Sequence, residues 1–184
     1  RLHFGGGTPL SLGPEGLRRL WNRLSEHFEI DPRGELAIEV DPRTTSLEHF
    51  EFLRELGFSR VSFGVQDLDA DVQDLIQRIQ PGSLVEQQLS RCRTLGFQSV
   101  NFDLVYGLPG QSVESFGETL DDVIRMRPDR IVVGEVRDAH RAELRGRGPV
   151  AGHEVVQVHG RRVAPRARVA QQHPLARAPQ RERR

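Results

Sequence analysis

Apolar and polar residues alternate along the first part of the chain with two periods, one typical of strands and one typical of helices. Segment 16–28 has apolar residues at helical spacing, whereas segment 35–40 alternates apolar and polar residues and stops at an Asp-Pro pair. This succession recurs as far as residue 133. The pattern predicts strands over 35–40, 60–65, 100–105 and 130–133, with helices over 16–28, 47–56, 72–79, 83–95 and 113–124 between them.

Strands that alternate with helices indicate an α/β protein built from βαβ crossover units, and therefore a parallel sheet. Both an open sheet and a barrel fit this succession, and in either one functional groups gather at the carboxyl ends of the strands. The helix over 47–56 also has a start signal. Thr45 is expected to cap this helix, with Glu48 placed three residues later to complete a capping box.

Charge divides the chain at residue 134. The net charge of zero is the sum of −7 over residues 1–133 and +7 over 134–184, and all the aromatic residues precede residue 134. The second segment has few apolar residues and no lasting period, so it cannot bury enough surface to offset its chain entropy. We therefore expect an α/β domain over 1–133 and a disordered, arginine-rich tail over 134–184.

The composition excludes several classes of protein. No apolar run is long enough to span a membrane, and no charged segment followed by an apolar run opens the chain, so neither a membrane span nor a secretory signal is expected. Cys92 is the only cysteine, which excludes a disulfide framework and a metal or cluster site made of several thiolates of this chain. A reduced, cytoplasmic setting is expected.

Polar residues occur near the carboxyl ends of three predicted strands. Glu39, Gln66 and Asp103 have the same relative place in segments that are otherwise apolar. Each could satisfy a nearby loop amide, as most buried polar groups do, but three in register favour a ligand site. The triple glycine at 5–7 supports this interpretation, because it permits positive φ, close approach of a ligand and exposed amides that bind an anion. It is neither a Walker loop nor the dinucleotide fingerprint.

Five segments point to a known family. LHFGGGTP, IEVDPR, GVQD, QRIQP and NFDLVYGLPGQ occur in an order and spacing that closely resembles the oxygen-independent coproporphyrinogen III oxidases, which are radical S-adenosylmethionine (SAM) enzymes. The resemblance covers residues 1–133 and implies a partial (β/α)6 barrel, of which this stretch supplies the second to the sixth strands. It also implies a SAM site, in a family that holds two SAM molecules, made of Gly6, Gly7, Thr8, Glu39, Gln66, Arg78 and Asp103.

The chemistry of SAM fits these residues. Its ammonium group and ribose hydroxyls donate hydrogen bonds that Glu39 and Asp103 can accept. Its carboxylate suits bidentate binding by Arg78, which without the resemblance would be interpreted as a solvated helix charge.

The resemblance further implies a reaction. In the family, a [4Fe–4S] cluster bound to SAM cleaves it to a 5′-deoxyadenosyl radical, which removes hydrogen from a propionate of coproporphyrinogen III. Loss of carbon dioxide and an electron leaves a vinyl group, and two propionates react, giving protoporphyrinogen IX in haem biosynthesis. The family's CxxxCxxC cluster loop lies upstream of everything in this sequence, so its metal ligands are absent from this chain. We expect the chain alone to be an inactive monomer, with no catalytic residue of its own and no electron donor identified.

Three alternatives stay open on the sequence. A related radical SAM haem chaperone has similar glycine and YGLP motifs, although IEVDPR and QRIQP favour the dehydrogenase. The arginines of the tail could bind nucleic acid phosphates, but the tail has no aromatic residue for base stacking. The tail also departs from the family at Gly134, and it is rich in Arg, Ala, Pro, Gly, Val and His, which are residues typical of high-GC codons. The third alternative is therefore a frameshift near codon 133, which would make 134–184 an out-of-frame translation.

Overall fold

One sheet of six strands organises the computed structural model, which describes residues 1–31, 33–136 and 155–158. The strands lie in the order of the sequence, and each pair from β1 to β5 is parallel, whereas β6 runs antiparallel to β5. The predicted parallel α/β class is therefore confirmed. The strands are β1 (Leu2–Phe4), β2 (Leu36–Val40), β3 (Arg60–Gln66), β4 (Ser99–Tyr106), β5 (Arg130–Glu135) and β6 (Val155–Val158).

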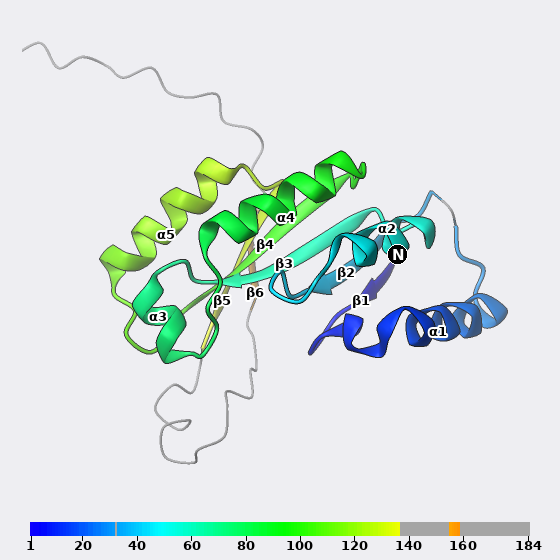
Figure 1. Ribbon diagram of the computed structural model, residues 1–184, viewed down its shortest axis with the longest axis horizontal. Helices are drawn as coiled ribbons and strands as arrows, with labels where there is room; N and C mark the ends of the chain where they lie inside the picture. Colours follow the sequence, from blue (N-terminus) through cyan, green and yellow to red (C-terminus); the bar gives the residue numbers. More distant parts are fainter. Residues whose placement is uncertain (32, 137–154, 159–184) are drawn as a thin grey trace, which may run out of the picture.

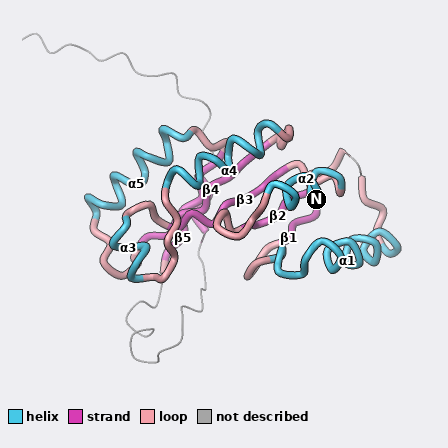
Figure 2. The backbone as a smooth tube through the Cα atoms, viewed as in Figure 1, coloured by secondary structure: helices cyan, strands magenta, loops and turns pink. Residues whose placement is uncertain are grey.

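Helices connect the strands as far as β5, and Figure 2 shows the alternation along the chain. Because every crossover steps to the next strand in the same direction, right-handed connections place the helices on one face of the sheet. Figure 1 shows α2 and α4 across that face. This is the wall of a barrel and not a doubly wound sheet, whose strand order reverses. The helices are η1 (Pro9–Leu12), α1 (Gly13–His27), α2 (Leu47–Glu55), α3 (Ala70–Leu75), α4 (Gly82–Thr94) and α5 (Val113–Met126).

Alternate residues of the central strands form an apolar face beneath the helices. Phe63 and Phe102 are fully buried, and their rings stack with centroids 5.7 Å apart. Phe50 of α2 is also fully buried, and its ring centroid lies 6.1 Å from that of Phe63. Full burial of one such side chain contributes about 1.5–3 kcal/mol. This helix-covered face therefore supplies most of the packing that stabilises the fold.

The start of α2 differs from the prediction. Ser46 is the cap: its hydroxyl accepts a hydrogen bond from the His49 N–H at 3.4 Å, and the His49 ring accepts one from the Ser46 N–H at 3.0 Å. The predicted cap at Thr45 with Glu48 is wrong, because the Thr45 hydroxyl donates instead to the Asp41 carbonyl oxygen at 2.7 Å. The cap therefore lies one residue later than predicted, and the hydroxyl of Thr45 has a buried partner in the Asp41 carbonyl oxygen.

Two further boundaries also moved. The predicted helix over 72–79 is the shorter α3, because Gln77 has a φ of 53°, outside the helical region. β5 extends to Glu135, past the expected boundary at 133, and β6 lies within the segment expected to be disordered. The sequence VVQV is rich in β-branched residues, which favour a strand. The prediction of a disordered tail therefore does not apply to β6. The rest of the predicted tail, 137–154 and 159–184, lies outside the described residues.

Candidate functional site

A cleft of about 460 Å³ opens on the face of the sheet opposite the apolar face. This volume is within the range of pockets that hold a small molecule. The cleft follows from the period of two along each strand, because the residues between the buried apolar ones are polar or small. Six of the seven residues selected from the sequence line it: Gly7, Thr8, Glu39, Gln66, Arg78 and Asp103.

The glycine loop after β1 is held against the end of β2. The Gly6 N–H donates to Oε2 of Glu39 at 3.0 Å, and Nε2 of His3 lies 3.0 Å from Oε1 of the same carboxylate. Gly6 and Gly7 have φ values of 78° and 55°, in the left-handed region that favours glycine. Gly6 itself does not line the cleft, so its contribution is to fix Glu39 and to aim the loop.

The carboxyl end of β3 is strained at Gln66. Its φ is 67°, and the Asp67 N–H donates to the Val65 carbonyl oxygen at 2.9 Å, which closes a γ-turn around it. Such a conformation costs on the order of 1–3 kcal/mol and persists only where neighbouring contacts fix it. The fully buried Asp67 provides these contacts, because its carboxylate accepts hydrogen bonds from Thr119 of α5, at 2.6 Å, and from Gln111. The strained turn places Gln66 in the wall of the cleft.

Gly64 leaves room for two cleft side chains. A Cβ at this position would lie 3.0 Å from Nε2 of Gln66 and 3.3 Å from Nη2 of Arg78. Arg78 follows α3 and reaches back to β3, where its Nη2 donates to the Gly64 carbonyl oxygen at 2.8 Å. Its Nη1 lies 3.2 Å from Oδ2 of Asp41. Burial lowers the pKa of Arg78, and the negative charge of Asp41 opposes this shift.

Asp103 on β4 has an unusual electrostatic setting. It is half-buried, and burial together with the negative charge of Glu39 raises its pKa to about 7, against the opposing positive charge of Arg60. Perturbed acids of this kind are typical of functional sites. A cationic ligand, or one with several hydrogen-bond donors, would relieve the repulsion between the two carboxylates. The acidic part of the cleft is therefore suited to such a ligand.

Further residues that the sequence reasoning missed line the same cleft. They share the cleft face with the selected residues, and the period of two could have found them once the strands were placed. Nδ2 of Asn101 donates to Oγ of Ser62 at 3.2 Å, joining β4 to β3. These additional lining residues include Asp41, Arg60, Ser62, Asn101 and Arg130.

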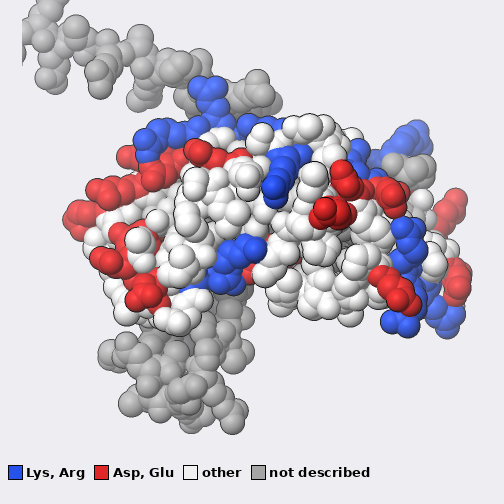
Figure 3. All heavy atoms as spheres, viewed as in Figure 1, with Lys and Arg blue, Asp and Glu red and all other residues white. Residues whose placement is uncertain are grey.

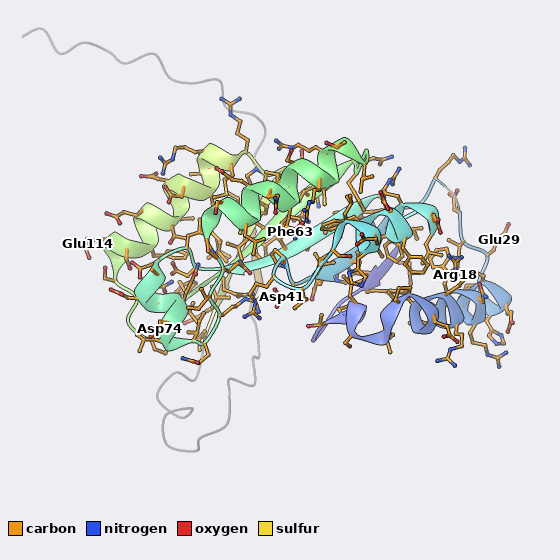
Figure 4. All side chains as sticks on the ribbon, viewed as in Figure 1. Arg18, Glu29, Asp41, Phe63, Asp74 and Glu114 are labelled. Carbon is orange, nitrogen blue, oxygen red and sulfur yellow. The ribbon has the colours of Figure 1, made fainter. Side chains whose placement is uncertain are left out.

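The acidic surplus of the domain lies elsewhere. Figure 3 shows acidic side chains gathered over α3 and α5, and Figure 4 shows Asp74 and Glu114 on the outside of these helices. Both residues are exposed. Charges in such a position are solvated, and they do not form part of the cleft.

Metal ligands do not gather in the part of the chain that the structure describes: it contains no group of three or more His, Cys, Asp or Glu residues that could hold a metal ion. Cys92 is buried on α4, and burial raises the pKa of its thiol to about 12. It is therefore protonated at neutral pH. Over the same described residues, no helix is long and apolar enough to cross a membrane.

Two protein-family models match parts of this chain, and several known proteins are similar to it in sequence. Residues 1–123 match the Radical SAM superfamily, and residues 99–167 match Type II/IV secretion system proteins. The oxygen-independent coproporphyrinogen III oxidase of Pseudomonas aeruginosa is 46% identical over 135 residues, which are 72% of this chain and 29% of that protein. The chain thus spans less than a third of this relative.

Solved structures agree with the match to the Radical SAM superfamily. The coproporphyrinogen III oxidase of Escherichia coli, described as a radical SAM enzyme, superposes with a TM-score of 0.69 at 44% identity, covering 73% of this chain and 31% of that one. The archaeal Elp3 of Methanocaldococcus infernus, at 20% identity and a TM-score of 0.61, covers 79% of this chain and 40% of its own and shows the fold alone. The secretion-system match covers the smaller part of the chain and overlaps the first over 99–123, so it assigns no family.

Proposed function

This chain belongs to the radical SAM superfamily, and we propose that it forms the SAM-binding part of an oxygen-independent coproporphyrinogen III oxidase. The chain spans 29% of the Pseudomonas relative. The complete reaction, oxidative decarboxylation of two propionates of coproporphyrinogen III to vinyl groups, is proposed for an enzyme of the relative's full length. This chain's own part would be to bind and orient SAM.

One observation carries the proposal: residues from five separate segments converge on one cleft. The segments are the glycine loop, β2, β3, the turn after α3 and β4, and each contributes at least one of the residues expected to contact SAM. The polar residues of the cleft could instead serve only as acceptors for nearby backbone N–H groups. Of the two acidic residues expected to contact SAM, Glu39 accepts a hydrogen bond from the glycine loop, so this explanation does not account for the convergence of five segments. The cleft has the donors and acceptors of a ligand site.

The donor set matches the groups of SAM. Glu39 and Asp103 would accept hydrogen bonds from the ammonium group and the ribose hydroxyls, and both would favour the positive charge of the ligand. Arg78 would pair with the carboxylate. SAM, when bound, supplies the group that removes hydrogen from the substrate. The residues of this chain hold SAM in one orientation and limit the access of water to it.

The [4Fe–4S] cluster does not fit this chain. Such a cluster is held by several cysteine thiolates, and the sequence has Cys92 alone. That residue is buried in the helix layer as a protonated thiol. We therefore assign no redox step to the residues of this chain.

We further propose that the enzyme acts in the cytoplasm, as a monomer, on coproporphyrinogen III and without a nucleic acid partner. The substrate carries carboxylates, which need cations near the reacting site. Arg78 is assigned to SAM and Arg60 pairs with Glu35, so Arg130 is the cleft cation that supports this substrate class.

Titration of SAM into the full 184-residue chain, followed by isothermal calorimetry, tests the proposal. The wild-type chain should bind SAM, and Glu39→Gln should weaken binding about tenfold, or about 1.4 kcal/mol, because it removes the negative charge that would face the ammonium group and keeps only a neutral acceptor for the Gly6 N–H. Glu51→Gln, on the exposed face of α2, is the matched control and should change nothing. A wild-type chain that binds no SAM, or equal losses in the two variants, would contradict the proposal.

A further inference from the structure

Asp41 lies between two arginines at the end of β2. Its carboxylate accepts two hydrogen bonds from the Arg43 side chain: Nε donates to Oδ1 at 3.0 Å, and Nη2 donates to Oδ2 at 2.7 Å. Nη1 of Arg78 lies 3.2 Å from that Oδ2 atom. Asp41 is only 9% exposed, so solvent screens these charges weakly. Figure 4 shows it near the middle of the molecule, far from the outer carboxylate of Glu29.

Asp41 is ionised in this setting. Burial raises the pKa of its carboxyl group, but the hydrogen bonds from Arg43 and the charge of Arg78 outweigh burial and hold the pKa below its ordinary value. One carboxylate between two guanidinium groups leaves a surplus of one positive charge. The group that would complete the arrangement is therefore an anion.

Arg78 is oriented by two contacts on its terminal nitrogens. Nη2 donates to the Gly64 carbonyl oxygen, at 2.8 Å, and Nη1 faces Asp41. Its Nε is buried and has no hydrogen-bond partner among the described residues. A buried donor without a partner is unfavourable, so the guanidinium group of Arg78 is not fully satisfied in the free chain. A carboxylate is the group that matches the flat fork of a guanidinium.

The sequence contains a second copy of the same tripeptide. Asp-Pro-Arg occurs at 31–33 and at 41–43. In both copies the aspartate accepts a hydrogen bond from the backbone N–H of the arginine, at 2.9 Å for Asp31 and 3.0 Å for Asp41. The Asp31 side chain, however, is 61% exposed, whereas that of Asp41 is 10% exposed. The turn is thus local, and the contact with Arg78 depends on the place of Asp41 in the fold.

We propose that Asp41 is a positioning residue that holds Arg78 for the carboxylate of SAM, an inference that rests on the proposed function. Asp41 acts through Arg78. Its negative charge keeps Nη1 directed toward β2 and so fixes the guanidinium group of Arg78 in the wall of the cleft. Without that charge, Arg78 would retain only its bond to Gly64 and would lose rotational restraint.

The test compares two variants and two ligands in the full chain. Asp41→Asn keeps an acceptor for the Arg43 N–H but removes the charge that faces Arg78, and Asp31→Asn makes the same change in the exposed copy of the turn. The ligands are SAM and decarboxylated SAM, which lacks only the carboxylate. Asp41→Asn should weaken SAM about tenfold and leave decarboxylated SAM within about twofold of wild type, whereas Asp31→Asn should change neither.

The choice of ligands separates positioning from folding. If Asp41 only built the turn, Asp41→Asn would weaken both ligands alike, and that result would overturn the inference. Addition of Arg78→Gln to Asp41→Asn gives a second readout: the double variant should bind SAM no more weakly than Arg78→Gln alone, because both changes remove the same contact. Additive losses would contradict the proposal.

The failure of this inference is distinguishable from failure of the proposed function. Binding of SAM by wild type with no loss in Asp41→Asn would overturn the role of Asp41 alone. Absence of SAM binding by the wild-type chain would overturn both.

Discussion

Ser62 and Phe63 are neighbours on β3, and they illustrate the two uses of one sheet. Both are buried, at 7% and 0% exposure. The ring of Phe63 packs between Phe50 and Phe102 on the helix-covered face, whereas the hydroxyl of Ser62 accepts a hydrogen bond from Asn101 in the cleft. Burial therefore has two meanings in this protein. On one face it stabilises the fold, and on the other it places polar groups where a ligand can meet them.

The cleft face carries several unfavourable features in the free protein. Asp103 has a raised pKa, Gln66 has a strained backbone and Nε of Arg78 has no partner among the described residues. The packed aromatic face must offset these costs, because the stability of a domain is a small difference between large opposing contributions. Variants on each face should therefore change the free energy of unfolding by different amounts.

The largest effect is expected from Phe63→Ala. Removal of a fully buried ring that contacts two others leaves a cavity, so the free energy of unfolding should fall by about 3–5 kcal/mol, measured by urea denaturation followed by circular dichroism. Phe28→Ala is the control, because that ring is 65% exposed, and it should cost less than about 1 kcal/mol. Equal losses in the two variants would mean that the sheet face is not the main source of stability.

An intermediate effect, dependent on pH, is expected from Asp103→Asn. The pKa of Asp103 in the folded chain is about 7, above its ordinary value of 3.8, so the folded state binds this proton more tightly than the unfolded state does. The contribution of Asp103 to stability therefore falls as the pH rises from about 4 to about 7 and is constant beyond that window.

Asparagine has no such titration. Relative to wild type, Asp103→Asn should gain up to about 4 kcal/mol of unfolding free energy between pH 4 and pH 8, measured by denaturation at each pH. Asp74→Asn on the exposed side of α3 provides the reference. A flat difference across this range would show that Asp103 is not strained in the free cleft.

The smallest effect is expected from Ser62→Ala. It removes one neutral hydrogen bond on the cleft face and should lower the free energy of unfolding by about 1 kcal/mol, again in urea. A loss as large as that of Phe63→Ala would erase the distinction between the two faces. Val61→Ala, on the apolar face beside it, should cost more, about 2 kcal/mol or above.

Much of the fold and of the candidate site could be predicted from the sequence. The strands and helices follow from local periodicity, and Glu39, Gln66 and Asp103 were recognisable because a polar residue near the end of an apolar strand is conspicuous. Gly6, Gly7, Thr8 and Arg78 came from the family resemblance. The structure brings all of these but Gly6 into one cleft. Their contacts with SAM and the frameshift in the tail stay predictions.

The cap of α2 shows why other details could not be predicted. Thr45 and Ser46 are adjacent hydroxyl residues, and both suit a cap by local rules. Ser46 is the cap because the hydroxyl of Thr45 donates its hydrogen bond to the Asp41 carbonyl oxygen. The strand β6 was missed for a similar reason, since a short apolar segment becomes a strand only when an edge such as β5 is available to pair with it.

The two Asp-Pro-Arg turns separate what the sequence determined from what the tertiary structure decided. The turn follows from local sequence, because the aspartate accepts a hydrogen bond from the arginine N–H within the same three residues in both copies. The sequence by itself also determined the alternation that gives the sheet an apolar and a polar face. The contact of Arg78 with Asp41, and not with Asp31, depends on the folded arrangement of the chain. That contact joins residues 37 positions apart, and it exists because the segment after α3 folds back to β3, beside the end of β2, where burial strengthens the interaction between the charges.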